Sequence, residues 1–247
     1  MMKRILFTVW ATVLLSGVSG AQTRQFPMTV IRNHCIDFKN LKRESGEFRD
    51  CKVSEFGRFG AVGGRTYYYA LYCIIPNYAE AGSCGDSSFA ARYHRARGLA
   101  VFVRNPSSAR ANLLFERVSA EIATEYSEKP EIIRNRFGTI LYLPIVVDGT
   151  GHMNESEYYL REGGAWQRIE AESWLTETMK RVPPDLAAWK GVWPDLHTMR
   201  AEALLYRSND ANCCPSGGVA RVRLSIRAKR FVVDSVAVDT TTLLRAP

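Results

Sequence analysis

The order of apolar and polar positions predicts strands through most of the chain after residue 66. Residues 67–75 (YYYALYCII) are rich in aromatic and β-branched side chains, are apolar on both faces of a strand, and are followed by Pro76. This pattern is typical of a strand in the centre of a sheet. Shorter runs bounded by Gly, Pro, Ser or Asn predict further strands at residues 99–104, 112–118, 131–136 and 140–147. Two hairpins are predicted, at residues 157–169 and 219–238.

A helical pattern interrupts these strands. Ser173 can cap a helix that runs to residue 182, and Pro183 ends it. Residues 185–190 predict a second short helix, with a glycine as its C-cap. Three tryptophans in this region are expected to pack in the core. The alternative is that they line a sugar-binding face. The predicted fold class is mainly β, a β-rich α+β fold in which an antiparallel hairpin meander carries a short helical insertion.

The strands suggest a weak internal repeat. Residues 67–104, 140–169 and 203–238 each contain a long strand, a polar loop with Asp or Asn and Gly, and then a second strand. The three segments share this pattern rather than their residues, so a simple meander of hairpins is the alternative. A repeated array of this kind would project its loops from one edge and would form a solenoid, a propeller-like array or a β-sandwich.

The first residues have the features of a secretory signal peptide. Lys3 and Arg4 precede an apolar run over residues 5–18, and small residues end at Ala21, before Gln22. The apolar run is too short for a spanning helix, which needs about 20 residues. We therefore expect a cleaved leader, no lipid or membrane anchor, and a periplasmic or secreted product. The expected organisation is a signal peptide (1–21), a β-rich region (22–170), a helical insertion (171–194) and a C-terminal β-hairpin region (195–247) in one domain with 22–170.

Charge and composition constrain the partners only loosely. The chain has 33 basic and 25 acidic residues, a net charge of +8, which becomes +6 if cleavage removes Lys3 and Arg4. This excess would favour an anionic envelope polymer, although a solvated basic surface has the same composition. No nucleic-acid-binding motif is present, and export disfavours nucleic acid as a partner.

Six cysteines form an even set, which in an exported chain predicts disulfide bonds. Proximity favours Cys35 with Cys51 and Cys73 with Cys84, among about 15 possible connectivities. Cys213 and Cys214 would then be left to each other. Neighbouring Cα atoms lie about 3.8 Å apart, below the usual range for a disulfide. The alternatives for this pair are a locked turn or a redox-active bond.

Catalytic and metal-binding motifs are scarce. Residues 81–85 (AGSCG) miss the G-x-S-x-G nucleophile motif by one glycine and lie in a loop between predicted strands. Ser83, His94 and Asp86 are the candidates if the chain is a hydrolase with a site assembled from distant residues. The histidines have no ligand spacing. The acidic loop at residues 148–157 departs from the EF-hand pattern, so an Asx-rich turn is favoured and weak calcium binding is the alternative. No metal and no cofactor are predicted.

Two groups of arginines are candidates for ligand binding, because guanidinium groups pair well with carboxylates and phosphates. The first group lies at a predicted turn and the second alternates with aliphatic residues along a predicted strand. The members are Arg92, Arg95 and Arg97 in the first group, and Arg221, Arg223 and Arg227 in the second.

The segment 212–218 (NCCPSGG), followed by a basic hairpin, resembles a module of uncharacterised exported bacterial proteins that include actinobacterial lipoproteins. The resemblance covers about the last 45 residues, by outline rather than by residue-for-residue match. This chain departs from the lipoprotein pattern because it lacks the lipid-bearing cysteine. The resemblance implies no catalytic residue. The favoured function is a non-enzymatic binding or envelope-associated module whose partner is an anionic envelope polymer or a protein. The alternatives are an exported hydrolase and a thiol-redox protein that uses Cys213 and Cys214.

Overall fold

The computed structural model describes residues 24–38, 48–76, 84, 96–118, 125–147, 156–188 and 190–241. These residues form antiparallel sheets with two short helices, so the predicted mainly β fold class is confirmed. Within them, neither helix is long and apolar enough to cross a membrane. The predicted signal peptide (residues 1–21) and residues 148–155 of the acidic loop lie outside the described residues.

The first sheet has the strand order β1-β5-β4-β3-β2. Its strands are β1 (Gln25–Pro27), β2 (Phe48–Val62), β3 (Arg65–Pro76), β4 (Ala96–Arg104) and β5 (Arg110–Val118), and α1 (Met28–Asn33) lies between β1 and β2. The strand predicted at residues 67–75 is part of β3, which lies between β2 and β4. Tyr69 packs on one face of the sheet and Ala70 on the other, so this strand is central and buried on both faces, as predicted.

The second sheet has the order β11-β10-β8-β7. Its strands are β7 (Glu131–Asn135), β8 (Gly138–Leu143), β10 (Glu157–Glu162) and β11 (Ala165–Arg168). A two-stranded ribbon of β6 (Glu125–Ser127) and β9 (Ile145–Val147) accompanies it. The single strand predicted at residues 140–147 is wrong in one respect, because the chain leaves β8 at Pro144 and enters the ribbon. Proline has no N–H to donate to a sheet, which accounts for the break.

The third sheet has the order β12-β13-β14-β15. Its strands are β12 (Leu186–Ala187), β13 (Arg200–Arg207), β14 (Gly218–Arg227) and β15 (Arg230–Asp239), and α4 (Ser173–Met179) packs beside it. The helix predicted at residues 185–190 is wrong. Leu186 and Ala187 instead pair with Tyr206 and Arg207 as an edge strand.

The cap predicted for the first helix is also wrong. Ser173 is the first residue of α4, and the capping oxygens belong to Glu170. The Glu170 carboxylate accepts hydrogen bonds from the backbone N–H groups of Glu172 and Ser173, at 2.7 and 2.8 Å. A carboxylate at this end of a helix also faces the positive end of the helix dipole.

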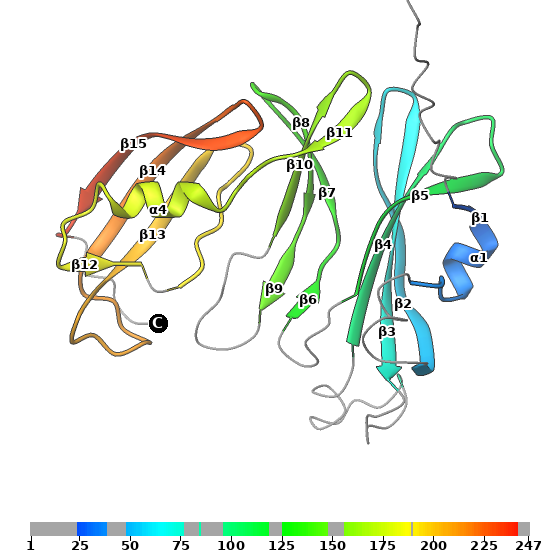
Figure 1. The fold of residues 1–247 in the computed structure, drawn as a ribbon, viewed down its shortest axis with the longest axis horizontal. Helices are drawn as coiled ribbons and strands as arrows, with labels where there is room; N and C mark the ends of the chain where they lie inside the picture. The colour runs from blue at the N-terminus through cyan, green and yellow to red at the C-terminus, as the bar shows by residue number, and fades with distance from the viewer. Residues whose placement is uncertain are drawn as a thin grey trace, which may run out of the picture.

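The three sheets stack face to face (Figure 1). Tyr69, Val101 and Leu141 belong to the apolar layer between the first and second sheets. The opposite face of the second sheet packs against the third sheet and α4, in a core that includes Ile140 and Trp174. The second sheet is therefore buried on both faces, and α1 covers the outer face of the first sheet.

Each stacked sheet contains four antiparallel strands in chain order, β2-β3-β4-β5, β7-β8-β10-β11 and β12-β13-β14-β15, and a loop or ribbon connection separates the second strand from the third. These connections follow β3, β9 and β13, and the strand ends from which they leave lie along the lower edge of the molecule in Figure 1. Short turns lie along the opposite edge, at Gly63-Gly64, Gly163-Gly164 and residues 228–229. The three segments compared in the sequence thus occupy equivalent places in the three sheets. The described residues thus form an open stack of antiparallel sheets.

Candidate functional site

Two cavities share the side chains of Arg117 and Glu157. One, of about 300 Å³, lies between the first and second sheets and is also lined by Phe115 and Tyr159. The other, of about 270 Å³, lies between the second sheet and the start of α4 and is also lined by Trp174. We call this pair of cavities the Arg117–Glu157 cleft. Each cavity lies near the lower end of the size range typical of small-molecule sites.

The shared ion pair joins two sheets. Arg117 stands near the end of β5, and Glu157 is the first residue of β10. Arg117 Nη1 donates to Glu157 Oε1 at 3.0 Å, and Tyr159 Oη donates to Glu157 Oε2 at 2.5 Å. Tyr159 can do so because residues two apart on a strand share a face. Burial raises the pKa of the Tyr159 hydroxyl, and its hydrogen bond to Glu157 and the charge of that carboxylate raise it further. Both Glu157 oxygens are therefore held in place.

A third carboxylate in the cleft, Glu170, is fully engaged. Besides capping α4, it accepts from Ser173 Oγ at 2.7 Å and pairs with Arg230 Nε at 3.0 Å. Burial opposes ionisation of Glu170, but the hydrogen bonds from Ser173 and Glu172 and the charge of Arg230 outweigh it and lower its pKa. Glu170 is thus a structural anion rather than a group open to a ligand.

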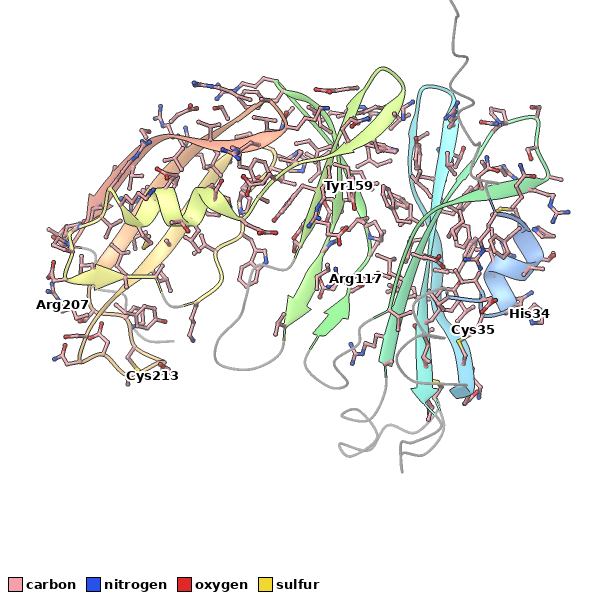
Figure 2. All side chains as sticks on the ribbon, viewed as in Figure 1. His34, Cys35, Arg117, Tyr159, Arg207 and Cys213 are labelled. Atoms are coloured by element: carbon pink, nitrogen blue, oxygen red, sulfur yellow. A yellow bond between two sulfur atoms is a disulfide. The ribbon has the colours of Figure 1, made fainter. Side chains whose placement is uncertain are left out.

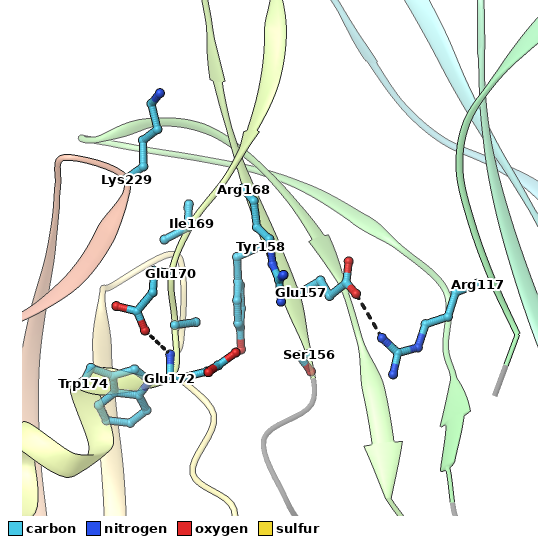
Figure 3. A pocket seen from close by; sticks show the side chains of 11 residues that line it. Arg117, Ser156, Glu157, Tyr158, Arg168, Ile169, Glu170, Glu172, Trp174 and Lys229 are labelled. Carbon is cyan, nitrogen blue, oxygen red and sulfur yellow. Dashed lines mark hydrogen bonds and ion pairs between the residues drawn. The ribbon is translucent and has the colours of Figure 1, made fainter. Parts of the chain in front are cut away.

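Two charged residues of the cleft remain without an ion pair among the residues that the structure describes, namely Arg168 and Glu172. Both side chains are exposed. Figure 3 shows the Arg168 guanidinium directed toward Glu157 and Tyr158, while Lys229 points away from them. Glu172 extends toward Tyr158 from the other side. The cleft therefore offers one open cation and one open carboxylate over a wall that includes aromatic rings.

Ser156 is a buried hydroxyl in the same cleft, 8% exposed. Its Oγ accepts from the backbone N–H of Ile145 at 3.2 Å and lies 3.5 Å from Tyr142 Oη. The described lining residues include no histidine or cysteine. Ser156 is consequently tied to the start of β9 and serves to connect β9 with β10.

The hydrolase candidates Ser83, Asp86 and His94, and the arginines Arg92 and Arg95, lie outside the described residues. Arg97 is described: it is exposed near the start of β4 and lines a separate cavity of about 270 Å³ beside the Cys73–Cys84 bond. Within the described parts of the chain, no group of three or more His, Cys, Asp or Glu side chains is placed to hold a metal ion.

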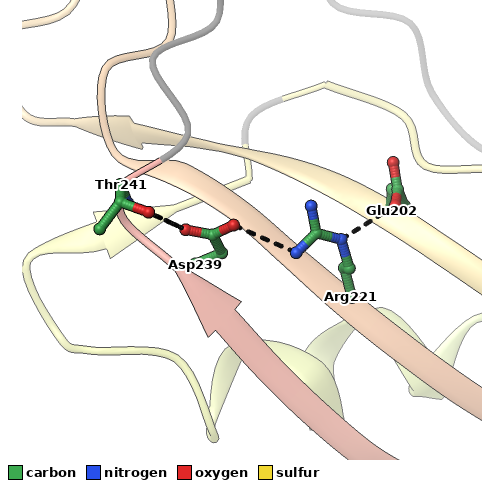
Figure 4. A network of polar contacts seen from close by, with 4 residues as sticks. All are labelled: Glu202, Arg221, Asp239 and Thr241. Carbon is green, nitrogen blue, oxygen red and sulfur yellow. Dashed lines mark hydrogen bonds and ion pairs between the residues drawn. The ribbon is translucent and has the colours of Figure 1, made fainter.

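The second group of arginines lies on the outer face of the third sheet. Arg221, Arg223 and Arg227 are exposed, whereas Val222 and Leu224 are buried, so the predicted alternation is present in β14. Arg221 lies between Glu202 and Asp239, at 3.2 Å from each (Figure 4). Arg227 pairs with Asp234 at 2.8 Å. Arg221 and Arg227 are therefore neutralised within the sheet, which leaves them poorly disposed to attract an anion.

The disulfide bonds Cys35–Cys51 and Cys73–Cys84 are present, which confirms the pairing inferred from proximity. Cys35, which Figure 2 places near α1, bonds to Cys51 in the edge strand β2. Cys73 in β3 bonds to Cys84. The structure also joins Cys213 to Cys214. Disulfide bonds are found mainly in proteins of oxidising compartments.

The residues that form the Arg117–Glu157 cleft carry no motif in the sequence. Arg117, Glu157 and Arg168 are ordinary charged positions of predicted strands, and Glu172 precedes the predicted helix. Their only common signal is that each lies at or just beyond the end of a strand. The stacking of sheets brings them together, and spacing along the chain does not encode that stacking. No protein-family model matches this chain, and the comparison with curated proteins gives no match either.

Proposed function

We propose that this protein is an exported, non-catalytic binding module that holds an acidic saccharide, of the kind found in envelope polymers, in the Arg117–Glu157 cleft. The observation that carries this proposal is the pair of open charges, Arg168 and Glu172, beside an ion pair that is already satisfied. Export is inferred from residues 1–21 and agrees with the disulfide bonds.

The chemistry of the cleft suits a ligand with both an anionic group and hydroxyl donors. A guanidinium group forms two parallel hydrogen bonds with a carboxylate, which gives Arg168 a specific role toward a uronic acid or a similar group. The Glu172 carboxylate can accept hydrogen bonds from sugar hydroxyls. Tyr158 and Trp174 line the base of this cavity but are only 4% and 2% exposed, so they shape its wall and offer little surface of their own to a ligand.

The satisfied Arg117–Glu157 pair has a different role. Because Tyr159 and Arg117 hold both oxygens of Glu157, this carboxylate keeps its position when a ligand enters. The pair also connects the first sheet to the second, so the two walls of the cleft are fixed relative to each other. A fixed wall lowers the ordering cost of binding, which is the advantage of a preformed site.

The experiment is isothermal titration calorimetry with trigalacturonate, matched with neutral galactotriose. Trigalacturonate should bind, and the neutral sugar should bind at least about tenfold more weakly, because hydrogen bonds to charged groups contribute about 1.5–3 kcal/mol. Arg168→Gln should weaken trigalacturonate binding by a similar factor, and Glu172→Gln should weaken it less. Arg223→Gln removes an exposed arginine from the far sheet and should leave the affinity unchanged.

Three results would contradict the proposal. The first is the absence of a measurable heat of binding when trigalacturonate is added at millimolar concentration. The second is equal affinity for the charged and the neutral sugar. The third is an equal loss in Arg168→Gln and Arg223→Gln, which would indicate nonspecific attraction to a basic protein.

A further inference from the structure

The connection between β13 and β14, residues 208–217, carries a bonded pair of adjacent cysteines at the surface. Cys213 and Cys214 are both exposed, whereas the four other cysteines are partly buried. Cys35 and Cys51 pack against one apolar core, and Cys73 and Cys84 pack against Ile75. The bond at residues 213–214 is thus the one disulfide of the chain that a reagent in solvent can approach freely. Figure 2 shows Cys213 at the lower edge of the molecule.

The fold of this connection depends on contacts that do not involve sulfur. The Asp210 carboxylate accepts hydrogen bonds from the backbone N–H groups of Arg207 and Ser216, at 2.7 and 2.8 Å, and from Ser216 Oγ at 2.7 Å. The N–H of Gly217 donates to the carbonyl of Leu205 at 2.8 Å. These bonds tie the start of the connection to its end. The connection should therefore keep its course when the sulfur–sulfur bond opens.

The bond itself joins no separate elements of the fold. Cys35–Cys51 and Cys73–Cys84 connect Cα atoms 6.1 and 5.9 Å apart, with sequence separations of 16 and 11 residues. In Cys213–Cys214 the Cα atoms are 3.8 Å apart, as the peptide bond between them requires. This spacing lies below the range of about 4.4–6.8 Å that disulfides usually adopt, and bonds outside that range are more easily reduced.

We propose that Cys213–Cys214 is a thiol–disulfide exchange site that takes two electrons from a dithiol while the protein stays folded. A thiolate of the dithiol attacks the Sγ of one cysteine, the bond between the cysteines breaks, and the other cysteine leaves as a thiolate that takes up a proton. The second thiol of the reductant then attacks its own sulfur in the mixed disulfide and releases the first cysteine. The products are two protein thiols and one oxidised dithiol, so electrons and protons balance.

Exposure decides which bond reacts, because the attacking thiolate must approach along the axis of the sulfur–sulfur bond. Adjacency also makes the reaction reversible, since the two thiols cannot move apart after reduction and any disulfide oxidant finds both within reach. A bond that served only to lock the turn would instead be needed for the folded connection, and its reduction would disturb the contacts of Asp210.

The test is limited reduction of the native protein with dithiothreitol, followed by alkylation and peptide mass spectrometry over time. Cys213 and Cys214 should be alkylated at least about tenfold faster than Cys73 and Cys84. No cysteine should be alkylated before dithiothreitol is added. Oxidised glutathione should restore the bond, and the near-UV circular dichroism of the reduced and oxidised proteins should agree.

The matched control is the double variant Cys213→Ser/Cys214→Ser, which should show no early alkylation and a smaller fall in the urea midpoint than Cys35→Ala/Cys51→Ala. Equal reduction rates for all three bonds would overturn the proposal. So would alkylation at residues 213 and 214 before reductant is added, since the two cysteines would then be free thiols. Loss of the native spectrum when this bond alone is reduced would assign it to locking the turn.

Discussion

Removal of each disulfide in turn should separate the two bonds that stabilise the fold from the one that does not. The variants are Cys35→Ala/Cys51→Ala, Cys73→Ala/Cys84→Ala and Cys213→Ala/Cys214→Ala, each compared with the unaltered protein by urea unfolding under oxidising conditions. A disulfide stabilises a protein mainly by limiting the freedom of the unfolded chain, and the effect grows with the length of the loop that it closes.

The loop lengths set the expected magnitudes. Separations of 16 and 11 residues correspond to about 3 kcal/mol of unfolding free energy for each of the first two bonds. A separation of one residue limits the unfolded chain very little, and the same relation yields about 1 kcal/mol or less. The first two variants should also lose some packing, because their cysteines contact apolar cores. A loss at Cys213–Cys214 as large as that at Cys35–Cys51 would refute this reasoning.

Three further predictions concern the fold. Gly218→Ala should cost about 3 kcal/mol or more in urea unfolding, because φ is +92° and an added Cβ would lie 2.1 Å from the Asp239 carbonyl oxygen. Leu141→Ala, at a fully buried position between two sheets, should cost about 2–5 kcal/mol, whereas Leu204→Ala, at a site that is 41% exposed, should cost much less. Hydrogen bonds from Ser216 and Arg207 lower the pKa of Asp210. Asp210 therefore stabilises the folded protein fully at pH values above the pKa that it has in the unfolded chain. This stabilisation is lost as the pH falls through the lower pKa that Asp210 has in the folded protein. The protection of the Arg207 and Ser216 amides against exchange, relative to their intrinsic exchange rates at each pH, should fall at that pH, and Asp210→Asn should show the lower protection at neutral pH.

The central parts of the sheets could be predicted from the sequence because their signal is local. Burial on both faces of β3 follows from its continuous apolar run, and the turn between β10 and β11 follows from the paired glycines Gly163 and Gly164. The strand β2 was not predicted, because charged residues and glycines break its alternation and its pairing with β3 contains three register shifts. Such features are common in edge strands, where they discourage pairing with other chains.

The candidate site could not be predicted in the same way. Arg117 and Glu157 are 40 residues apart and meet only because the first and second sheets stack. Arg221 was a candidate from the sequence and Arg168 was not, but in the structure Glu202 and Asp239 lie beside Arg221 and neutralise it. Pairing across strands depends on register and stacking, which the pattern of one strand does not contain. The cysteines were easier, because close spacing along the chain already restricts which pairs can meet.

The most direct test of the binding proposal is an amide chemical-shift titration of the folded protein with trigalacturonate. The largest shifts should fall on the backbone amides of Glu157, Arg168 and Glu172, in the Arg117–Glu157 cleft. The outer face of the third sheet, including Arg223, should show little change. If the shifts instead cluster on that outer face or on residues 208–217, the cleft is not the binding site and the proposed function is wrong.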